Sequence, residues 1–440
     1  MTDLRQLWIV FPLLLGMTCA FAGPNIQHWV TERGTRVYHV EAKDLPLVDV
    51  QLLFDAGSAR DGQHFGLAAM TSGLLDKGAG DWNADHIAQR LEGIGAVLGT
   101  SVSRDSASLV LRSLSRADIL KSALETMAKV VALPRFSEMD FFRERKRVLA
   151  GLRRFGELPG KVGGQAYYQD IYRGHPYGHR VLGESATVAA LTVGAIREFH
   201  RRYYVASNAV AVVVGDTSRE RVESMVMELT EKLPAGPPPE PIPQVDLAGP
   251  GGTQTIHFPS RQTHIFSGMA ALNRHDPEYF ALYVGNYILG GSGLVSKISG
   301  QIRDERGLAY SASSYFAPLA EKGPFTMSVQ TRNDQAPEAL AVLRKTFVNF
   351  IDNGPSEEEL TRAKKSITGG FVLRIDSNSK MSNYVAMIGF YGLPIDYLDT
   401  FTDKVNSVTT VDIRKAFHSH LQLDHFQTVL VGGRSQSHGN

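Results

Sequence analysis

The sequence predicts an α+β fold in which two homologous domains, each an antiparallel sheet packed with helices, are joined by a Pro-rich linker. Three observations support this prediction: the length of 440 residues, a proline cluster near the middle of the chain, and a pattern that recurs after 217 residues. Because single hydrophobic cores stop growing near about 250–300 residues, the length alone indicates more than one domain.

The composition is that of an ordinary globular protein, with 43% hydrophobic and 21% charged residues. Lys and Arg number 46 against 45 for Asp and Glu, which leaves a formal net charge of +1. A chain with so little net charge has no excess of positive charge to attract a polyanion, so nucleic acid is not an expected partner. The densest basic stretch, 143–154, contains apolar residues at helical spacing and is typical of the solvated face of an amphipathic helix.

Residues 1–22 have the layout of a secretory signal peptide. A basic residue precedes the apolar run 7–17, and residues 20–22 form a small-x-small cleavage site. The run is shorter than the about 20 residues that a spanning helix needs, which leaves an uncleaved anchor as the less favoured alternative. Cleavage would remove Cys19, the single cysteine. We therefore expect an exported, periplasmic protein without disulfides and without stable membrane insertion.

The clearest boundary is a proline cluster, with six prolines among the ten residues 234–243. Such a segment cannot lie in a helix or a central strand and favours an extended polyproline II strap. The sequence therefore predicts an N-terminal domain over 23–233, a linker over 234–244 and a C-terminal domain over 245–440.

The two parts end in the same way. Segment 191–199, followed by the apolar run 209–215, corresponds to 408–416 followed by 426–432, and each pair predicts a short helix and then a buried strand. This internal similarity indicates one α+β unit used twice.

A second correspondence marks the start of a long helix in each part. Ser137 with Asp140, and Ser356 with Glu359, have the spacing of a capping box. Further along the pattern, strands are expected over 48–54 and 325–330 and a helix over 337–350.

The segment from His64 to Ala79 reads H-F-G-L-A-A-M-T-S-G-L-L-D-K-G-A. It resembles the insulinase/pitrilysin family of zinc metalloendopeptidases, which carry G-x-A-H-F-x-E-H-M-x-F-K-G-T at this point. In active members the two His and a downstream Glu bind zinc, and the motif Glu is the general base for the attacking water. The resemblance covers nearly the whole mature chain and implies a clam-like half-chamber built from two such domains.

The family's four functional positions are vacant in this chain. They are held by Ala69, Ser72 and Gly73 on the expected helix and by Gly151 downstream. Ala and Gly offer no donor atom and a neutral serine binds zinc poorly, so we expect a domain kept for its shape, without metal. The sequence gives no physical account of Gly73 inside a helix, although close packing against the sheet is one possibility.

Other histidines offer no better metal site. His175 and His179 are four residues apart, but the Pro and Gly between them predict a loop instead of a helix. His418, His420 and His425 surround the last helix-to-strand connection and are expected in a solvated loop.

The second part keeps a stretch that matches the family motif L-G-G-G-x-x-S-R-L … L-R-E-x-R-G-L-A-Y-S over 289–315. Its residues Gly290, Gly291, Ser292 and Gly293 occupy the place that the resemblance assigns to substrate binding. Taken without the resemblance, these glycines indicate only a flexible start to a helix.

The same stretch predicts a helix over 296–306, ended by Gly307, and a strand over 308–315. This reversal would bring Arg303 near Tyr310. The resemblance implies that the two side chains hold the substrate carbonyl and stabilise its oxyanion. The alternative is that Arg303 pairs with Glu305 or another surface acid while Tyr310 packs in the core.

The sequence thus predicts the zinc-free subunit of an exported heterodimeric zinc metalloendopeptidase, inactive alone. The resemblance implies a partner subunit that bears H-x-x-E-H and holds the zinc, while Arg303 and Tyr310 act in trans on peptide substrates. A non-enzymatic scaffold or peptide-binding module with the same fold is the second hypothesis. An enzyme that uses other residues is the third, although the sequence has neither G-x-S-x-G nor a cysteine nucleophile in the mature chain.

Overall fold

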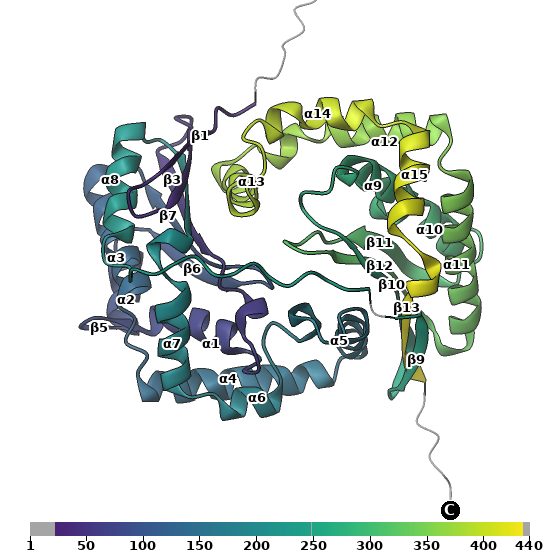
Figure 1. Cartoon of the computed structure of the whole chain (residues 1–440), viewed down its shortest axis with the longest axis horizontal. Helices are drawn as coiled ribbons and strands as arrows, with labels where there is room; N and C mark the ends of the chain where they lie inside the picture. The colour runs from purple at the N-terminus through teal and green to yellow at the C-terminus, as the bar shows by residue number, and fades with distance from the viewer. Residues whose placement is uncertain (1–22, 248, 434–440) are drawn as a thin grey trace, which may run out of the picture.

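The computed structural model describes residues 23–247 and 249–433 (Figure 1). The predicted signal peptide and its cleavage site lie outside these residues. Within the described ranges, no helix combines the length and the apolar character needed to cross a membrane.

The N-terminal half is built on a six-stranded sheet with the strand order β1-β2-β8-β3-β7-β6. All neighbours are antiparallel except β2 and β8, which are parallel. A short separate hairpin joins β4 to β5. The strands are β1 (Gln27–Val30), β2 (Arg36–Glu41), β3 (Leu47–Phe54), β4 (Gly78–Ala79), β5 (Trp82–Asn83), β6 (Val97–Val102), β7 (Ala107–Leu114) and β8 (Ala209–Gly215).

The C-terminal half has a five-stranded sheet with the order β11-β12-β10-β13-β9. Its strands are β9 (Gly252–His257), β10 (Ser260–Leu272), β11 (Ala309–Phe316), β12 (Gly323–Arg332) and β13 (Gln427–Gly433). Read from β9, this order repeats the order β2-β8-β3-β7-β6 of the first half, with the parallel pair at the same place. The two sheets therefore share one topology, as the internal repeat in the sequence predicts. The prediction that both sheets are purely antiparallel is wrong, because each contains one parallel pair.

Helices cover one face of the N-terminal sheet and begin where the sequence predicts. Ser137 accepts a hydrogen bond from the backbone N–H of Asp140 at the start of α4, the long predicted helix. The helices are α1 (Leu67–Leu74), α2 (Ala84–Glu92), α3 (Ala117–Ala132), α4 (Glu138–Gly156), α5 (Pro159–Ile171), α6 (Ser185–Ala190), α7 (Val193–Tyr203) and α8 (Arg219–Thr230).

The C-terminal half repeats this capping. Ser356 and Glu359 form a complete capping box at the start of α12, and Thr409 with Asp412 forms another at α15. The helices are α9 (Tyr279–Asn286), α10 (Lys297–Ser299), α11 (Ala336–Asn353), α12 (Glu357–Gly369), α13 (Asn378–Tyr391), α14 (Tyr397–Ser407) and α15 (Thr410–His420).

The two halves exchange a helix across the middle of the molecule. Helix α5 of the N-terminal half packs on β10 and β13 of the other sheet, and α13 of the C-terminal half packs on β3 and β8 (Figure 1). As a result, Val210, Val212 and Val214 of β8 share one apolar core with the C-terminal half.

Small residues allow both exchanged helices to lie close to their sheets. A Cβ at Gly163 of α5 would lie 2.7 Å from the Phe266 ring, and one at Gly389 of α13 would lie 2.7 Å from the Tyr38 ring. Tyr167 adds a hydrogen bond from its hydroxyl to the backbone carbonyl of Phe325, at 2.6 Å. The helix exchange is therefore fixed by shape as well as by apolar burial.

A buried carboxylate joins the halves at the β6–β7 turn. Asp105 is 1% exposed and accepts hydrogen bonds from the Tyr177 hydroxyl at 2.5 Å and from the Tyr391 hydroxyl at 2.9 Å. The backbone N–H of Ala320 donates to the same carboxylate at 2.9 Å. Burial, together with the neighbouring Asp105 charge, raises the pKa of both tyrosines, which keeps them protonated as donors.

The Pro-rich segment over 234–244 has no helix or strand and runs between the halves. It is held at several points by hydrogen bonds to its backbone carbonyls. Arg60 donates to Glu240 at 2.7 Å, and Ser207 donates to Gly236 at 2.6 Å. Ile242 is buried with Tyr177 in a third apolar cluster, so the strap is packed along its course.

His200 of α7 is buried and neutral. Its Nε2 lies 2.8 Å from the backbone carbonyl of Val131, and its ring stacks on Tyr204. Burial lowers the pKa of His200 from 6.5 to about 4.

We predict that Asp105→Ala lowers the free energy of unfolding by about 3 kcal/mol, because it leaves two buried tyrosine hydroxyls without their charged acceptor. Urea unfolding of the two proteins measures this difference. Asp334→Ala, which removes an exposed carboxylate, should leave the stability unchanged. Equal stabilities for Asp105→Ala and the parent chain would contradict the role of Asp105 between the halves.

We predict that acidification destabilises the fold through His200. Between about pH 6.5 and pH 4, His200 binds a proton in the unfolded chain but stays neutral in the folded one. The free energy of unfolding therefore falls by about 1.4 kcal/mol for each pH unit below 6.5, whereas above pH 6.5 His200 is neutral in both states and its full contribution is present. Unfolding measured at intervals from pH 7 to 5 should show a shallower loss in His200→Gln, which cannot take up a proton. Parallel pH profiles for the two chains would rule out this contribution.

Candidate functional site

The segment that resembles the zinc motif forms helix α1, as predicted. Ala69 and Ser72 of this helix are buried, and the Ser72 hydroxyl lies 3.4 Å from the backbone carbonyl of Ser101 on β6. Helix α1 packs against α4 and α7 and against β6. Two of the three vacated positions on α1, Ala69 and Ser72, are therefore part of the packed interior, and Gly73 is partly buried.

The start of α1 is fixed by a carboxylate. Asp61 accepts hydrogen bonds from the backbone N–H groups of Gly66 and Ala68, both at 2.7 Å. Burial nevertheless raises the pKa of Asp61 to about 8. This carboxylate orients the first turn of α1, and Phe65 stacks on His179 beside it.

Gly73 is explained by Glu144 of α4. A Cβ at residue 73 would lie 2.7 Å from Oε1 of Glu144, which is 5% exposed and paired with Arg147. The close packing that the sequence left open as a possibility is thus against a helix and not against the sheet. The carboxylate of Glu144 occupies space next to the second histidine position of the family motif.

Gly151 lies seven residues, or about two turns, after Glu144 on the same helix. A Cβ at Gly151 would have no heavy atom within 4 Å. The structure therefore leaves open space at the fourth vacated position, while Glu144 fills the space beside Gly73.

These residues do not fit a zinc ion. Ala69, Gly73 and Gly151 have no donor atoms, Ser72 is a neutral hydroxyl, and the Glu144 carboxylate is already paired with Arg147. Across the described ranges, no group of three or more His, Cys, Asp and Glu side chains is placed to hold a metal ion. We derive no metal-dependent step for this chain.

The glycine segment of the second half follows α9 as a π-helical turn over Tyr287–Gly291. A Cβ at Gly290 would lie 2.4 Å from the backbone nitrogen of Ser314, so only glycine allows this turn to lie against β11. Gly290, Gly291 and Gly293 line a cavity of about 420 Å³ together with aromatic side chains, whereas Ser292 is not part of its wall. This cavity is where the glycine segment can contact a ligand.

Arg303 and Tyr310 are brought together as the sequence predicts. Ser296 caps α10, a π-helical turn over Gly300–Asp304 continues it, and Gly307 at φ +61° reverses the chain into β11. The guanidinium carbon of Arg303 lies 5.4 Å from the centre of the Tyr310 ring.

Tyr310 is 81% exposed, so the alternative that places it in the core is wrong. Arg303 also has an acidic neighbour, since its Nη1 lies 3.7 Å from Oδ1 of Asp304. The pair belongs to the C-terminal half, whereas α1 belongs to the N-terminal half (Figure 1). What Arg303 and Tyr310 do stays a prediction.

His175 and His179 flank the short 3₁₀ turn Pro176–Gly178, in agreement with the predicted loop. The Nε2 atom of His175 lies 2.8 Å from the carbonyl of Pro243, and that of His179 lies 3.0 Å from the carbonyl of Ser58. Both imidazoles therefore tie the loop to other backbone segments.

Two structural carboxylates escaped the sequence reasoning. Glu144 lies one helix away from Gly73 in the fold and 71 residues away in the sequence, and nothing in the sequence pairs the two. Asp105 lies in a polar turn and its hydrogen-bond donors come from distant segments, so no local pattern singles it out. Tyr177 lies between His175 and His179 in the predicted loop, and it is this tyrosine that bonds Asp105.

The fold and the emptied helix define a class: a two-domain α+β protein with metallopeptidase architecture and no ligands at the zinc position. Residues 36–185 match the family described as insulinase (peptidase family M16), and residues 190–367 match the peptidase M16 inactive domain. The crystal structure of the peptidase M16 inactive domain from Pseudomonas fluorescens is 34% identical, with a TM-score of 0.90 over 93% of this chain and 98% of that chain. The chain belongs to the insulinase (M16) family and to its inactive-domain type.

Two curated relatives show the range within the family. The non-peptidase homolog YmxG of Helicobacter pylori is 21% identical over 429 residues, which are 96% of this chain and 98% of the relative. An uncharacterized zinc protease of Streptomyces coelicolor is 26% identical over 347 residues, which are 78% of this chain and 75% of the relative. Similarity along the chain therefore extends to proteins described as peptidases and to one described as a non-peptidase.

We predict that Gly73 and Glu144 are energetically coupled. Gly→Ala inside a helix normally stabilises by about 1 kcal/mol, but here the added methyl group displaces the Glu144 carboxylate, so Gly73→Ala should bring no gain. In the Glu144→Ala background the same change should recover about 1 kcal/mol. A double-mutant cycle of unfolding free energies measures the coupling. A full gain from Gly73→Ala alone would contradict it.

Proposed function

We propose that this chain is the zinc-free subunit of an exported heterodimeric zinc metalloendopeptidase. Its partner is a family member of similar size that bears H-x-x-E-H and holds the zinc ion. The observation that carries the proposal is the asymmetry between the halves: none of the family's zinc ligands or its general base is present at the four positions, while Arg303 is kept next to the exposed ring of Tyr310.

The exposure of Tyr310 supports a role outside the chain itself. A tyrosine that only stabilised the fold would bury its ring, whereas 81% of Tyr310 is accessible. Leu294 and Val295, just after the glycine segment, are also exposed, at 55% and 85%. Exposed apolar side chains and an exposed tyrosine are typical of faces that a peptide or a partner covers.

The chemistry proposed for the pair follows from its donors. The Tyr310 hydroxyl and the Arg303 guanidinium donate hydrogen bonds to the carbonyl oxygen of the scissile peptide held at the partner's zinc site. As water adds to that carbonyl, negative charge grows on the oxygen, and fixed donors stabilise it more than they stabilise the substrate. The glycine segment holds the peptide backbone close to β11.

We predict that Arg303→Ala and Tyr310→Phe each lower kcat of the assembled enzyme by about 100-fold, the usual cost of one oxyanion donor. Assembly should be unchanged, because neither side chain belongs to an apolar core: Tyr310 is 81% exposed and the Arg303 side chain is 33% exposed. Arg306→Ala is the matched control, since this neighbouring arginine bonds Gln301 and Glu305 and should leave kcat unchanged. The measurement is peptide cleavage by the purified complex with an H-x-x-E-H partner, together with size-exclusion chromatography.

Three outcomes separate the hypotheses. Zinc-dependent peptide cleavage by this chain alone would overturn the assignment of a zinc-free subunit. An unchanged kcat in both variants would make Arg303 and Tyr310 structural residues. A chain that joins no H-x-x-E-H protein would favour the second hypothesis, a non-enzymatic scaffold or peptide-binding module, for which the non-peptidase homolog of Helicobacter pylori is a precedent within the family.

A further inference from the structure

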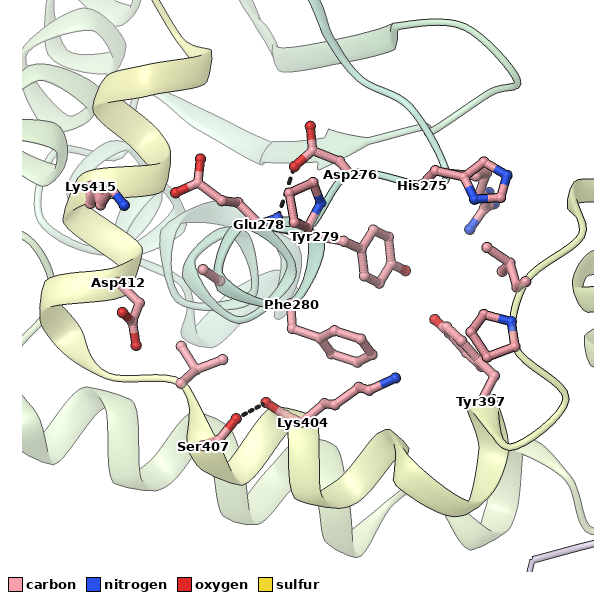
Figure 2. Close-up of a pocket in the computed structure, with 16 residues that line it drawn as sticks. His275, Asp276, Glu278, Tyr279, Phe280, Tyr397, Lys404, Ser407, Asp412 and Lys415 are labelled. Atoms are coloured by element: carbon pink, nitrogen blue, oxygen red, sulfur yellow. Dashed lines mark hydrogen bonds between the residues drawn. The ribbon is translucent and has the colours of Figure 1, made fainter.

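A second cavity of the C-terminal half has a volume of about 550 Å³ and lies between the β10–α9 connection, the α13–α14 connection, α14 and α15 (Figure 2). It is distinct from the cavity of the glycine segment, although Tyr279 contributes to both walls. A volume in this range suits a small molecule. No step of the proposed peptide chemistry uses it.

Three cations on its wall, Arg274, Lys404 and Lys415, form no ion pair with a carboxylate among the residues that the structure describes, and two of them carry the argument. These are Arg274, whose buried Nε has no hydrogen-bond partner, and Lys404, whose Nζ lies 5.7 Å from the centre of the Phe280 ring. The guanidinium carbon of Arg274 lies 5.3 Å from the Tyr391 ring centre. Cations that line one cavity without counter-ions favour the binding of an anion.

The acids that line the same cavity are already engaged. Asp276 lies 2.8 Å from Nε2 of His420, and Glu278 accepts a hydrogen bond from Ser419 at 2.9 Å. Asp412 accepts hydrogen bonds from Thr409 at the start of α15. The expectation of a solvated loop is wrong for His418 and His420, because both lie in α15, and His420 is held between two carboxylates.

The donors converge on one space beside an apolar surface. Figure 2 shows the Lys404 amine and the hydroxyl groups of Tyr279 and Tyr397 pointing into the same part of the cavity, next to the ring of Phe280. Pro277, Pro394 and Leu393 add apolar wall. The cavity thus presents a charged, hydrogen-bonding end and an aromatic side.

We propose that this cavity binds a small amphipathic anion, with a carboxylate or phosphate group on an aromatic or aliphatic body. The anionic group pairs with Lys404 and Arg274 and accepts hydrogen bonds from Tyr279 and Tyr397. The body packs against Phe280 and the prolines. This inference does not depend on the proposed heterodimer, because every residue that it uses belongs to this chain.

Isothermal titration of the full chain in low-chloride buffer tests the proposal, with phenyl phosphate and phenylacetate as probes. We expect saturable binding of at least one probe at a 1:1 ratio, and the tighter of the two identifies the headgroup. Lys404→Met should weaken that binding by about tenfold or more. Lys365→Met, an exposed lysine on α12, is the matched control and should bind like the parent chain.

Each remaining result counts against the site. If neither probe gives saturable heat up to about 10 mM, the proposal is overturned, because a dissociation constant above that concentration is too weak for a binding site. Benzyl alcohol that binds as tightly as phenylacetate would exclude the charged end, and inorganic phosphate that binds as tightly as phenyl phosphate would exclude the apolar side. Unchanged affinity in both Lys404→Met and Arg274→Met, with circular dichroism showing that each is folded, would place the probe elsewhere.

Discussion

Each sheet of this protein buries one face under a helix that comes from the other half of the chain. Helix α5 lies on β10 and β13, and α13 lies on β3 and β8, so neither sheet is complete without the opposite half. The Asp105 carboxylate, which bonds Tyr177 and Tyr391, closes the same junction with charged hydrogen bonds. The relative position of the halves is thereby fixed by packing, and the Pro-rich strap follows that arrangement.

This constraint explains why an emptied catalytic helix is still well formed. Helix α1 is part of the core that the N-terminal sheet shares with α4 and α7. Loss of α1 would therefore disrupt the N-terminal half, to which α5 belongs. Loss of the zinc ligands removes chemistry without removing apolar contacts. The space next to Gly73 is filled by Glu144, which turns a former site into ordinary helix packing.

The C-terminal half shows the opposite pattern. It keeps Arg303 next to an exposed Tyr310 and a glycine segment that lies against β11, and it adds a cavity in which Lys404 and Arg274 pair with no carboxylate of the described residues. The residues on which both proposals rest therefore lie in the second copy of the repeated unit, whereas the first copy lacks the family's zinc ligands.

The sequence by itself determined the repeated α+β units, the strap, the capped helices and the vacancy of the zinc position, because periodicity, capping boxes and donor atoms are local properties of the chain. It also placed Arg303 near Tyr310, since one helix-to-strand reversal separates them. The parallel strand pairs, the exchange of α5 and α13, the contact of Gly73 with Glu144 and the cluster on Asp105 were decided only by tertiary structure. These features join residues from 71 to more than 280 positions apart. Contacts of that kind depend on how surfaces pack, and no local pattern records them.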